Sequence, residues 1–134
     1  MEYRDLLKDE IEQIGKVLAK IISEFTQLKA KSPTLAIETT SMELKKHLNI
    51  DLDAITKLTY DKIKESFHKK NLSPIHIENL SDLLIEIAIL KKQKVYFTTA
   101  LTFLDLADEI SSTISFERLG KKQRIEKEMN NMMF

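Results

Sequence analysis

An apolar stripe dominates the first part of the chain. Its members recur alternately four and three residues apart: Leu7, Ile11, Ile14, Leu18, Ile21, Phe25 and Leu28. This heptad spacing places all seven side chains on one face of a helix, and it is typical of helices that pack lengthwise against a partner. We therefore predict a long N-terminal helix within residues 1–30, running from about Glu2 to about Lys29.

Two roles stay open for this helix. Val17 and Ile22 flank the stripe and broaden it, which indicates that at least part of the helix contacts its own domain. The full length of the stripe exceeds what a small domain usually needs, which favours a homodimer interface or a helix-binding surface. Gly15 also has two readings, either as a point where a second helix approaches closely or as a glycine on an exposed face.

Two later helices are predicted to start at the same signal. Ser32-Pro33 and Ser73-Pro74 each place a side-chain oxygen at the helix cap and a proline at the first helical position. The pattern Ile-Glu-x-x-Ser-x-x-Leu follows each of them: Ile37, Glu38, Ser41 and Leu44, then Ile77, Glu78, Ser81 and Leu84. This forty-residue offset predicts two helical hairpins, over residues 32–70 and 73–112.

The remaining pattern completes one all-α domain over residues 1–134. Thr59 is a candidate cap for a helix beginning at Tyr60, and Ser115 caps a final helix within residues 115–130. The second hairpin is the most hydrophobic part of the chain, so we expect Leu84 and Leu104 in the central core. The predicted fold is an irregular helical-hairpin array of five to seven helices, led by the long N-terminal helix.

Composition narrows the possible chemistry. The 134 residues include only two glycines and two prolines, which leaves little material for the tight turns of a sheet protein. There is no cysteine, which excludes disulfides, thiolate metal sites and cysteine nucleophiles. Acidic and basic residues balance at 21 each, so no global field attracts the chain to nucleic acid or to an anionic membrane.

The same composition bears on location. The first ten residues carry too many charges for a secretory signal. No apolar run approaches the roughly 20 residues that span a bilayer. We therefore expect a cytoplasmic protein with no membrane partner.

Paired lysines suggest a second function class. The pairs are Lys45-Lys46, Lys69-Lys70, Lys91-Lys92 and Lys121-Lys122, the last with Arg124 nearby. Such cations can bind phosphates, and a nucleic-acid-associated regulatory protein is the alternative reading. The first three pairs fall in the last turns of predicted helices, however, where cations stabilise the orphan carbonyls without any ligand. We favour that structural role and regard nucleic acid as an unlikely partner.

The histidines raise a third possibility, a helical metal-dependent enzyme. Glu65 and His68 have the Glu-x-x-His spacing of helical di-metal proteins. Those sites need a second such pair, whereas Glu43 and His47 are four residues apart. We therefore predict that Glu65 and His68 are not metal ligands. No phosphate-binding glycine loop or nucleophile motif is present, and we expect no catalytic residue and no cofactor.

The second hairpin resembles a tetratricopeptide-type repeat. Leu84, Ile87 and Ala88 look like its first-helix packing positions, and Ala100, Leu104 and Ala107 like its second-helix positions. Lys91, Ser112 and the forty-residue period depart from the family pattern. The layout is also similar to uncharacterised bacterial helical families described as repeat-like. The resemblance implies a protein-binding scaffold with no catalytic residues.

The sequence thus predicts a non-catalytic protein–protein interaction or scaffold module. Its partner would be another protein or a second copy of the chain. The candidate interface is the stripe of Leu7, Ile11, Ile14, Leu18, Ile21, Phe25 and Leu28.

Overall fold

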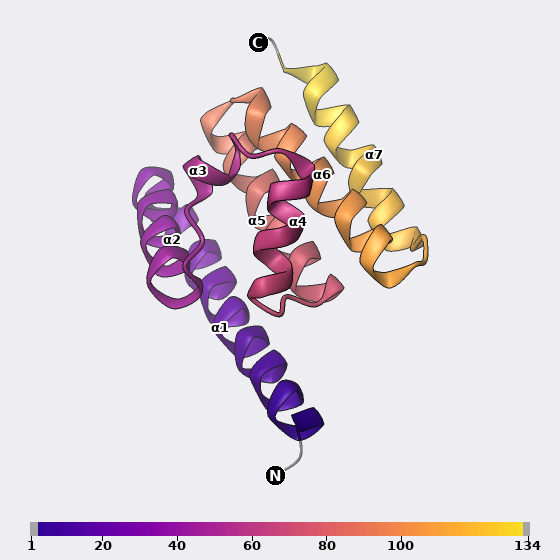
Figure 1. The fold of residues 1–134 in the computed structure, drawn as a ribbon. Helices are drawn as coiled ribbons and strands as arrows, with labels where there is room; N and C mark the ends of the chain where they lie inside the picture. The colour runs from indigo at the N-terminus through magenta and orange to yellow at the C-terminus, as the bar shows by residue number, and fades with distance from the viewer. Residues whose placement is uncertain (1–2, 133–134) are drawn as a thin grey trace.

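The computed structural model describes the backbone of residues 3–132 and the side chains of residues 6–132, and this part of the chain is all-α (Figure 1). Seven helices follow one another: α1 (Tyr3–Lys31), α2 (Pro33–Leu48), α3 (Leu52–Ile55), α4 (Tyr60–Lys69), α5 (Pro74–Lys91), α6 (Lys94–Ser111) and α7 (Phe116–Asn131). The predicted long N-terminal helix and the all-α class are confirmed. None of the described helices combines the length and the apolar character that crossing a bilayer requires.

Short polar side chains set the helix starts. Ser32, Thr59 and Ser115 accept hydrogen bonds from backbone N–H groups three residues later and so cap α2, α4 and α7. Asp51 caps the single turn of α3 in the same way. Pro33 and the proline after Ser73 stand at the first position of α2 and α5, where a backbone N–H is not needed. The predicted starts at Pro33, Tyr60 and Phe116 are therefore confirmed.

Two antiparallel helix pairs form the framework. α1 packs against α2, and α5 packs against α6. α1 also contacts α5, while α4 and α7 pack on α6, so the α5–α6 pair lies between the other helices (Figure 1). Glu86 of α5 links three of them, because its carboxylate pairs with Lys29 of α1 and with Arg124 of α7.

The core is centred on α5 and α6. Leu84 and Leu104 are fully buried, as the sequence predicted. The rings of Phe67 from α4 and Phe103 from α6 meet edge to face, with centroids 5.0 Å apart. Ser81 is also fully buried, and its hydroxyl donates to the carbonyl of Ala100, which satisfies this buried polar group.

The first helix pair differs from the predicted hairpin over residues 32–70. α2 packs mainly against α1, the helix that precedes it. Its buried face consists of Ala36, Thr40 and Leu44, a narrow row that begins with small side chains and lets the two helices approach closely. Residues 60–69 form α4, which packs on α6 instead.

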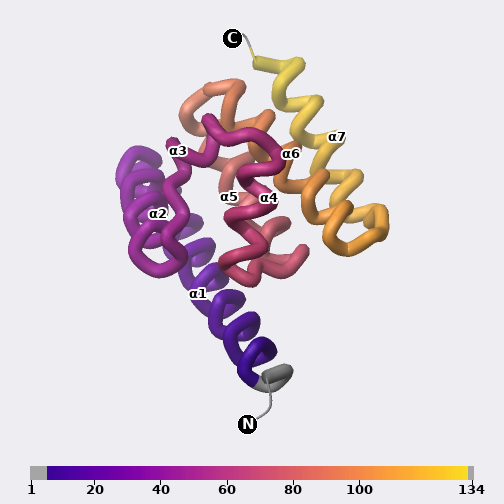
Figure 2. Tube along the Cα trace, viewed as in Figure 1, coloured from indigo at the N-terminus to yellow at the C-terminus, as the bar shows by residue number. Residues whose placement is uncertain are grey.

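The first half of α1 projects from the rest of the molecule. The tube in Figure 2 shows this part of the helix running beyond the turn between α4 and α5. We use the term lower end for the part of the molecule where α1, α5 and α7 begin and α4 and α6 end. In Figure 1 the α6–α7 connection lies at the right edge, above the projecting start of α1. The candidate interface begins on this projecting segment.

Candidate interaction surface

The predicted interface stripe is divided between core and surface. Leu18, Ile21 and Phe25, in the second half of α1, are buried in the chain's own core. Leu7, Ile14 and Leu28 are half-buried, and Ile11 is exposed at 36 %. The division follows from the projection of α1, because the helix is buried only where it runs alongside its neighbours. The stripe therefore serves both as core and as an open surface.

The open part of the stripe forms one wall of a groove. The groove has a volume of about 550 Å³ and lies between α1, α4, the α4–α5 turn and the last turn of α6. Leu7, Ile11, Leu72 and Ile110 provide its apolar surface, and its other lining residues are Asp61, Lys64, Glu65, His68, Asn71 and Ser73. We call it the α1–α4 groove. Its apolar floor and polar rim match the usual anatomy of a protein-binding or ligand-binding cleft.

Two of the charged residues at the rim of this groove, Lys64 and Glu65, already have partners. Lys64 Nζ lies 2.6 Å from a carboxylate oxygen of Glu109, and the hydroxyl of Tyr60 donates to the same carboxylate. These two hydrogen bonds lower the pKa of Glu109. Glu65 pairs with Lys69 at 3.2 Å. Lys64 and Glu65 therefore need no ion pair from an incoming partner, and the apolar area of the groove is available for binding.

A buried histidine fastens α1 beside the groove. His76 lies in the first turn of α5, and its Nδ1 accepts a hydrogen bond from the backbone N–H of Ser73 (3.1 Å). Burial lowers the pKa of His76, while a hydrogen bond to the backbone of Ile11 acts in the opposite direction. A Cβ on Gly15 would lie 3.6 Å from its Nε2. A neutral imidazole thus joins the start of α5 to the first half of α1.

The turn between α6 and α7 exposes two large apolar side chains. Ile114 is 82 % exposed and Phe116 is 93 % exposed, the highest values among the described large hydrophobic residues. We call this pair the α6–α7 apolar turn. The sequence did not predict this pair, because Ile114 precedes α7 and Phe116 is its first residue, so neither is part of a repeating helical stripe. The signal in the sequence was the presence of two large apolar residues on either side of the capping Ser115.

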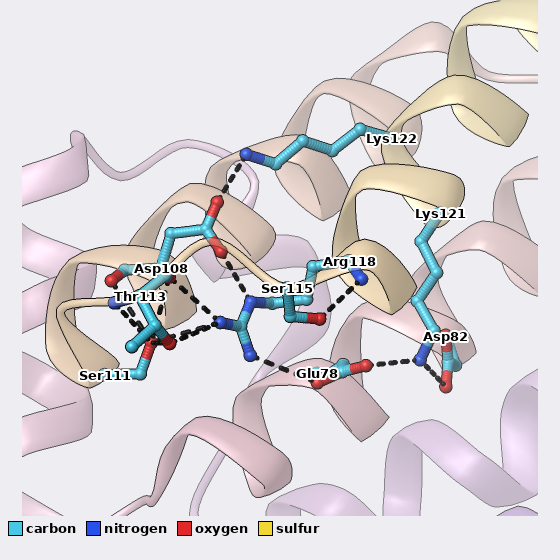
Figure 3. A network of polar contacts seen from close by, with 9 residues as sticks. All are labelled: Glu78, Asp82, Asp108, Ser111, Thr113, Ser115, Arg118, Lys121 and Lys122. Carbon is cyan, nitrogen blue, oxygen red and sulfur yellow. Dashed lines mark hydrogen bonds and ion pairs between the residues drawn. The ribbon is translucent and has the colours of Figure 1, made fainter.

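A network of ion pairs holds α7 on the other side of this turn (Figure 3). Arg118 is only 7 % exposed, and its Nε lies 2.5 Å from Asp108 of α6. Its NH1 lies 3.6 Å from Glu78 of α5, which is 4 % exposed. Another guanidinium nitrogen donates to Ser111 and to the carbonyl of Thr113 (both 3.1 Å). One buried arginine therefore links α5, α6, the connecting turn and α7.

Two lysines extend the network. Lys121 lies 2.9 Å from Glu78 and 3.0 Å from Asp82, and Lys122 lies 2.7 Å from Asp108 (Figure 3). Burial alone would raise the pKa of Asp108, but hydrogen bonds from Lys122 and Arg118 outweigh it and lower that pKa. The C-terminal lysine cluster is thus occupied by carboxylates, and its main role is to hold α7 in place.

The other lysine pairs lie at the C-terminal ends of helices, as the sequence predicted. Lys45 and Lys46 are in the last turn of α2, and Lys91 is in the last turn of α5. Lys91 Nζ also lies 4.9 Å from the centre of the Tyr96 ring, a cation–π contact. These cations lie next to the carbonyl groups at the C-terminal ends of their helices, which have no hydrogen-bond partner within the helix. This agrees with the prediction that the lysine pairs stabilise helix ends.

Two of the candidate metal ligands, Glu65 and His47, have partners on their own helices. Glu65 is engaged by Lys69, and His47 lies 2.9 Å from Glu43 of its own helix. Across the described residues, no three His, Asp or Glu side chains come together in a group that could hold a metal ion.

The chain was also compared with known proteins. It matches no family model, and neither the curated proteins nor the solved structures yielded a significant match. The resemblance of the second hairpin to tetratricopeptide-type repeats is thus without support from any family model, and what stands is an all-helical fold of adjacent packed pairs.

Proposed function

We propose that this protein is a non-catalytic protein-interaction module whose binding surface is its lower end. The observation that carries the proposal is the α1–α4 groove, where Leu7 and Ile11, two of the seven residues of the predicted interface stripe, form part of an accessible apolar surface. Apolar grooves walled by an amphipathic helix are a common way to bind a second protein segment.

The distribution of exposed apolar side chains supports this choice of surface. Seven of the eleven described large hydrophobic residues that are exposed lie at the lower end: Leu6, Ile11, Ile75, Ile110, Ile114, Phe116 and Leu119. Single exposed apolar residues are ordinary, but a concentration at one end of a molecule marks an interaction site. The pairing of Lys121 and Lys122 with carboxylates also favours this function over nucleic-acid binding.

Site-specific photo-crosslinking in the native host tests the proposal. A photoreactive amino acid at Ile110, inside the groove, should give discrete protein adducts, and Ile11→Lys in the same chain should abolish them. The matched control carries the probe at Met42, an exposed apolar position on α2 away from the groove. Equal adduct patterns from Ile110 and Met42 would contradict the proposal.

A further inference from the structure

We infer that the α1–α4 groove binds the α6–α7 apolar turn of a second copy of this chain, so that two copies form a reciprocal dimer. This inference rests on the proposed function and names the partner of the same surface. In the dimer, Ile114 and Phe116 of each copy enter the groove of the other.

The first observation is a protrusion that its own chain does not use. Phe116 opens α7, yet the cap of that helix comes from Ser115, whose hydroxyl accepts the N–H of Arg118 at 3.0 Å. At 93 % exposure, the phenyl ring has almost no packing within its own chain. Helix capping does not need an aromatic residue here, and an exposed aromatic ring is the typical central anchor of a protein interface.

The second observation is a cavity of matching chemistry. The groove, at about 550 Å³, is larger than one aromatic side chain and leaves room for Ile114 beside Phe116. Leu7, Ile11, Leu72 and Ile110 line it with apolar atoms, and the rim charges of Lys64 and Glu65 are already paired within the chain. An apolar anchor can therefore enter without leaving Lys64 or Glu65 unpaired.

The third observation is that the two features are adjacent in the chain, because the last turn of α6 lines the groove and the α6–α7 apolar turn follows it directly. Ile110 belongs to the groove, and Phe116 follows it by six residues across the α6–α7 turn. When an anchor and its cavity share one side of a molecule, a two-fold axis can insert each anchor into the opposite cavity simultaneously. Both contacts then belong to a single closed interface.

Area and charge agree with a second copy as the occupant. A standard interface buries about 800 Å² per partner, of which one aromatic residue supplies about 150–250 Å². Leu6, Ile11 and Ile75, all exposed at the same end, add further apolar area around the anchor. The formal net charge of the chain is +0 at pH 7, so two copies meet without overall repulsion.

A membrane surface fits the turn less well. The residues between α6 and α7 are hydroxylated or apolar, and Glu117 follows Phe116. The nearest cations after the anchor, Arg118, Lys121 and Lys122, are paired with carboxylates of the same chain, whereas interfacial segments usually offer cations to anionic headgroups.

Sedimentation velocity of the full chain over a range of concentrations tests the inference. Wild type should dimerise reversibly, and Phe116→Ser and Ile11→Lys should each raise the dissociation constant at least tenfold. Met42→Ser, which removes an apolar side chain that is 69 % exposed on α2, is the matched control and should leave it unchanged. Circular dichroism of each variant checks that the fold is retained.

Mixing the two variants gives a stricter test of reciprocity. Phe116→Ser keeps an intact groove and Ile11→Lys keeps an intact anchor, so an equimolar mixture should regain dimer that neither variant forms alone. No recovery on mixing, or a dimer that persists in both variants, would overturn the inference. A wild-type monomer at every concentration would also overturn it, whether or not the monomer binds phosphatidylglycerol vesicles. The proposed function is judged separately, because groove adducts to other proteins can still appear in the photo-crosslinking experiment.

Discussion

The two glycines of the chain lie within helices, while the left-handed positions at helix ends carry other residues. Gly15 is in α1 and Gly120 is in α7. Asn49, Lys92 and Ser112 adopt positive φ angles of 54–56° at the ends of α2, α5 and α6. Glycine is the residue that such ends favour, and it weakens a helix interior. The local backbone of this chain is therefore not optimised for stability.

Gly120→Ala should stabilise the protein by about 1 kcal/mol, because alanine has the higher helix propensity. Apart from the adjacent backbone of α7 itself and the two neighbouring residues, no described atom lies within 4 Å of the position that the new Cβ would occupy. Gly15→Ala should be tolerated as well, since its Cβ would meet His76 at an ordinary contact distance of 3.6 Å. Urea titration measures both effects. A destabilised Gly120→Ala variant would mean that this face of α7 is covered in solution.

His76 should make stability depend on pH. Its folded-state pKa lies below the ordinary value of 6.5, so the unfolded chain binds the proton more tightly than the folded one. The neutral ring makes its full contribution to the free energy of unfolding above pH 6.5, the ordinary pKa of histidine. That contribution is lost as the pH falls through the folded-state pKa of His76. Unfolding free energies measured from about pH 7.5 down to about pH 5 should therefore decline.

His76→Asn keeps an acceptor for the N–H of Ser73 but cannot titrate, so it should reduce this decline. The matched control is His68→Asn, at an exposed position, which should leave the decline in place. An unchanged pH profile in His76→Asn would assign the effect to other groups.

Leu84→Ala and Leu104→Ala should each cost about 2–5 kcal/mol, because both side chains are fully buried in the α5–α6 core and truncation leaves a cavity. Leu35→Ala, at an exposed position of α2, provides the comparison and should change stability by less than about 0.5 kcal/mol. Denaturant titration distinguishes the two classes. A loss under about 1 kcal/mol at either core site would contradict the central role of the α5–α6 pair.

Among the helices, α7 is attached in an unusual way. Its buried residues are Arg118 and Ile125, so ion pairs replace most of the apolar face that normally holds a surface helix. Arg118 contacts the carboxylates of Glu78 and Asp108 with almost no access to solvent. Arg124, in contrast, pairs with Glu86 from a half-exposed position. The position of α7 thus depends mainly on its first two turns.

Arg118→Ala should lower the free energy of unfolding by about 1–3 kcal/mol. This is a small loss for a broken buried ion pair, because Glu78 and Asp108 keep their lysine partners. Hydrogen exchange should accelerate throughout α7 before it accelerates in α5. Arg124→Ala, the control in the same helix, should cost less than about 1 kcal/mol. Equal costs for the two arginines would contradict the assigned role of the buried network.

The elements differ in how far local sequence determines them. The starts of α2, α4, α5 and α7 could be predicted, because each cap depends on a few adjacent residues such as Ser32 and Pro33. Helix pairing could not be predicted in the same way. α2 was expected to pair within residues 32–70, but its row from Ala36 to Leu44 fits equally well against any apolar helix, and in the fold it packs against α1.

The candidate surface was predicted only in part for the same physical reason. Leu7 and Ile11 belong to a periodic stripe that is visible in the sequence. Leu72 and Ile110 complete the groove from two distant segments, so their role appears only when the chain is folded. Ile114 precedes α7 and Phe116 is its first residue, and at such a helix start periodicity gives no information on exposure.

On the scale of the whole molecule, exposed apolar area gathers at one end, while ion pairs fasten α7 along its side (Figures 1 and 3). This asymmetry links the stability of the fold to association. A dimer that forms only from folded chains adds free energy of unfolding in proportion to the logarithm of protein concentration.

The melting temperature of the wild type should therefore rise with protein concentration. Phe116→Ser should make the melting temperature nearly independent of concentration, since the variant lacks the anchor. Met42→Ser should behave as the wild type does. Differential scanning calorimetry over a hundredfold range of concentration provides the measurement. A concentration-independent wild-type transition would argue against any homodimer.

The pairing of consecutive helices has a consequence for synthesis. α2 follows α1 directly, so this pair can close while the rest of the chain is still in the ribosome. The face of α1 that carries Leu18, Ile21 and Phe25 also needs α5, which begins more than forty residues after α1 ends. During that interval the nascent chain exposes the most apolar part of its first helix. This is the stage at which a ribosome-associated chaperone has the most surface to protect.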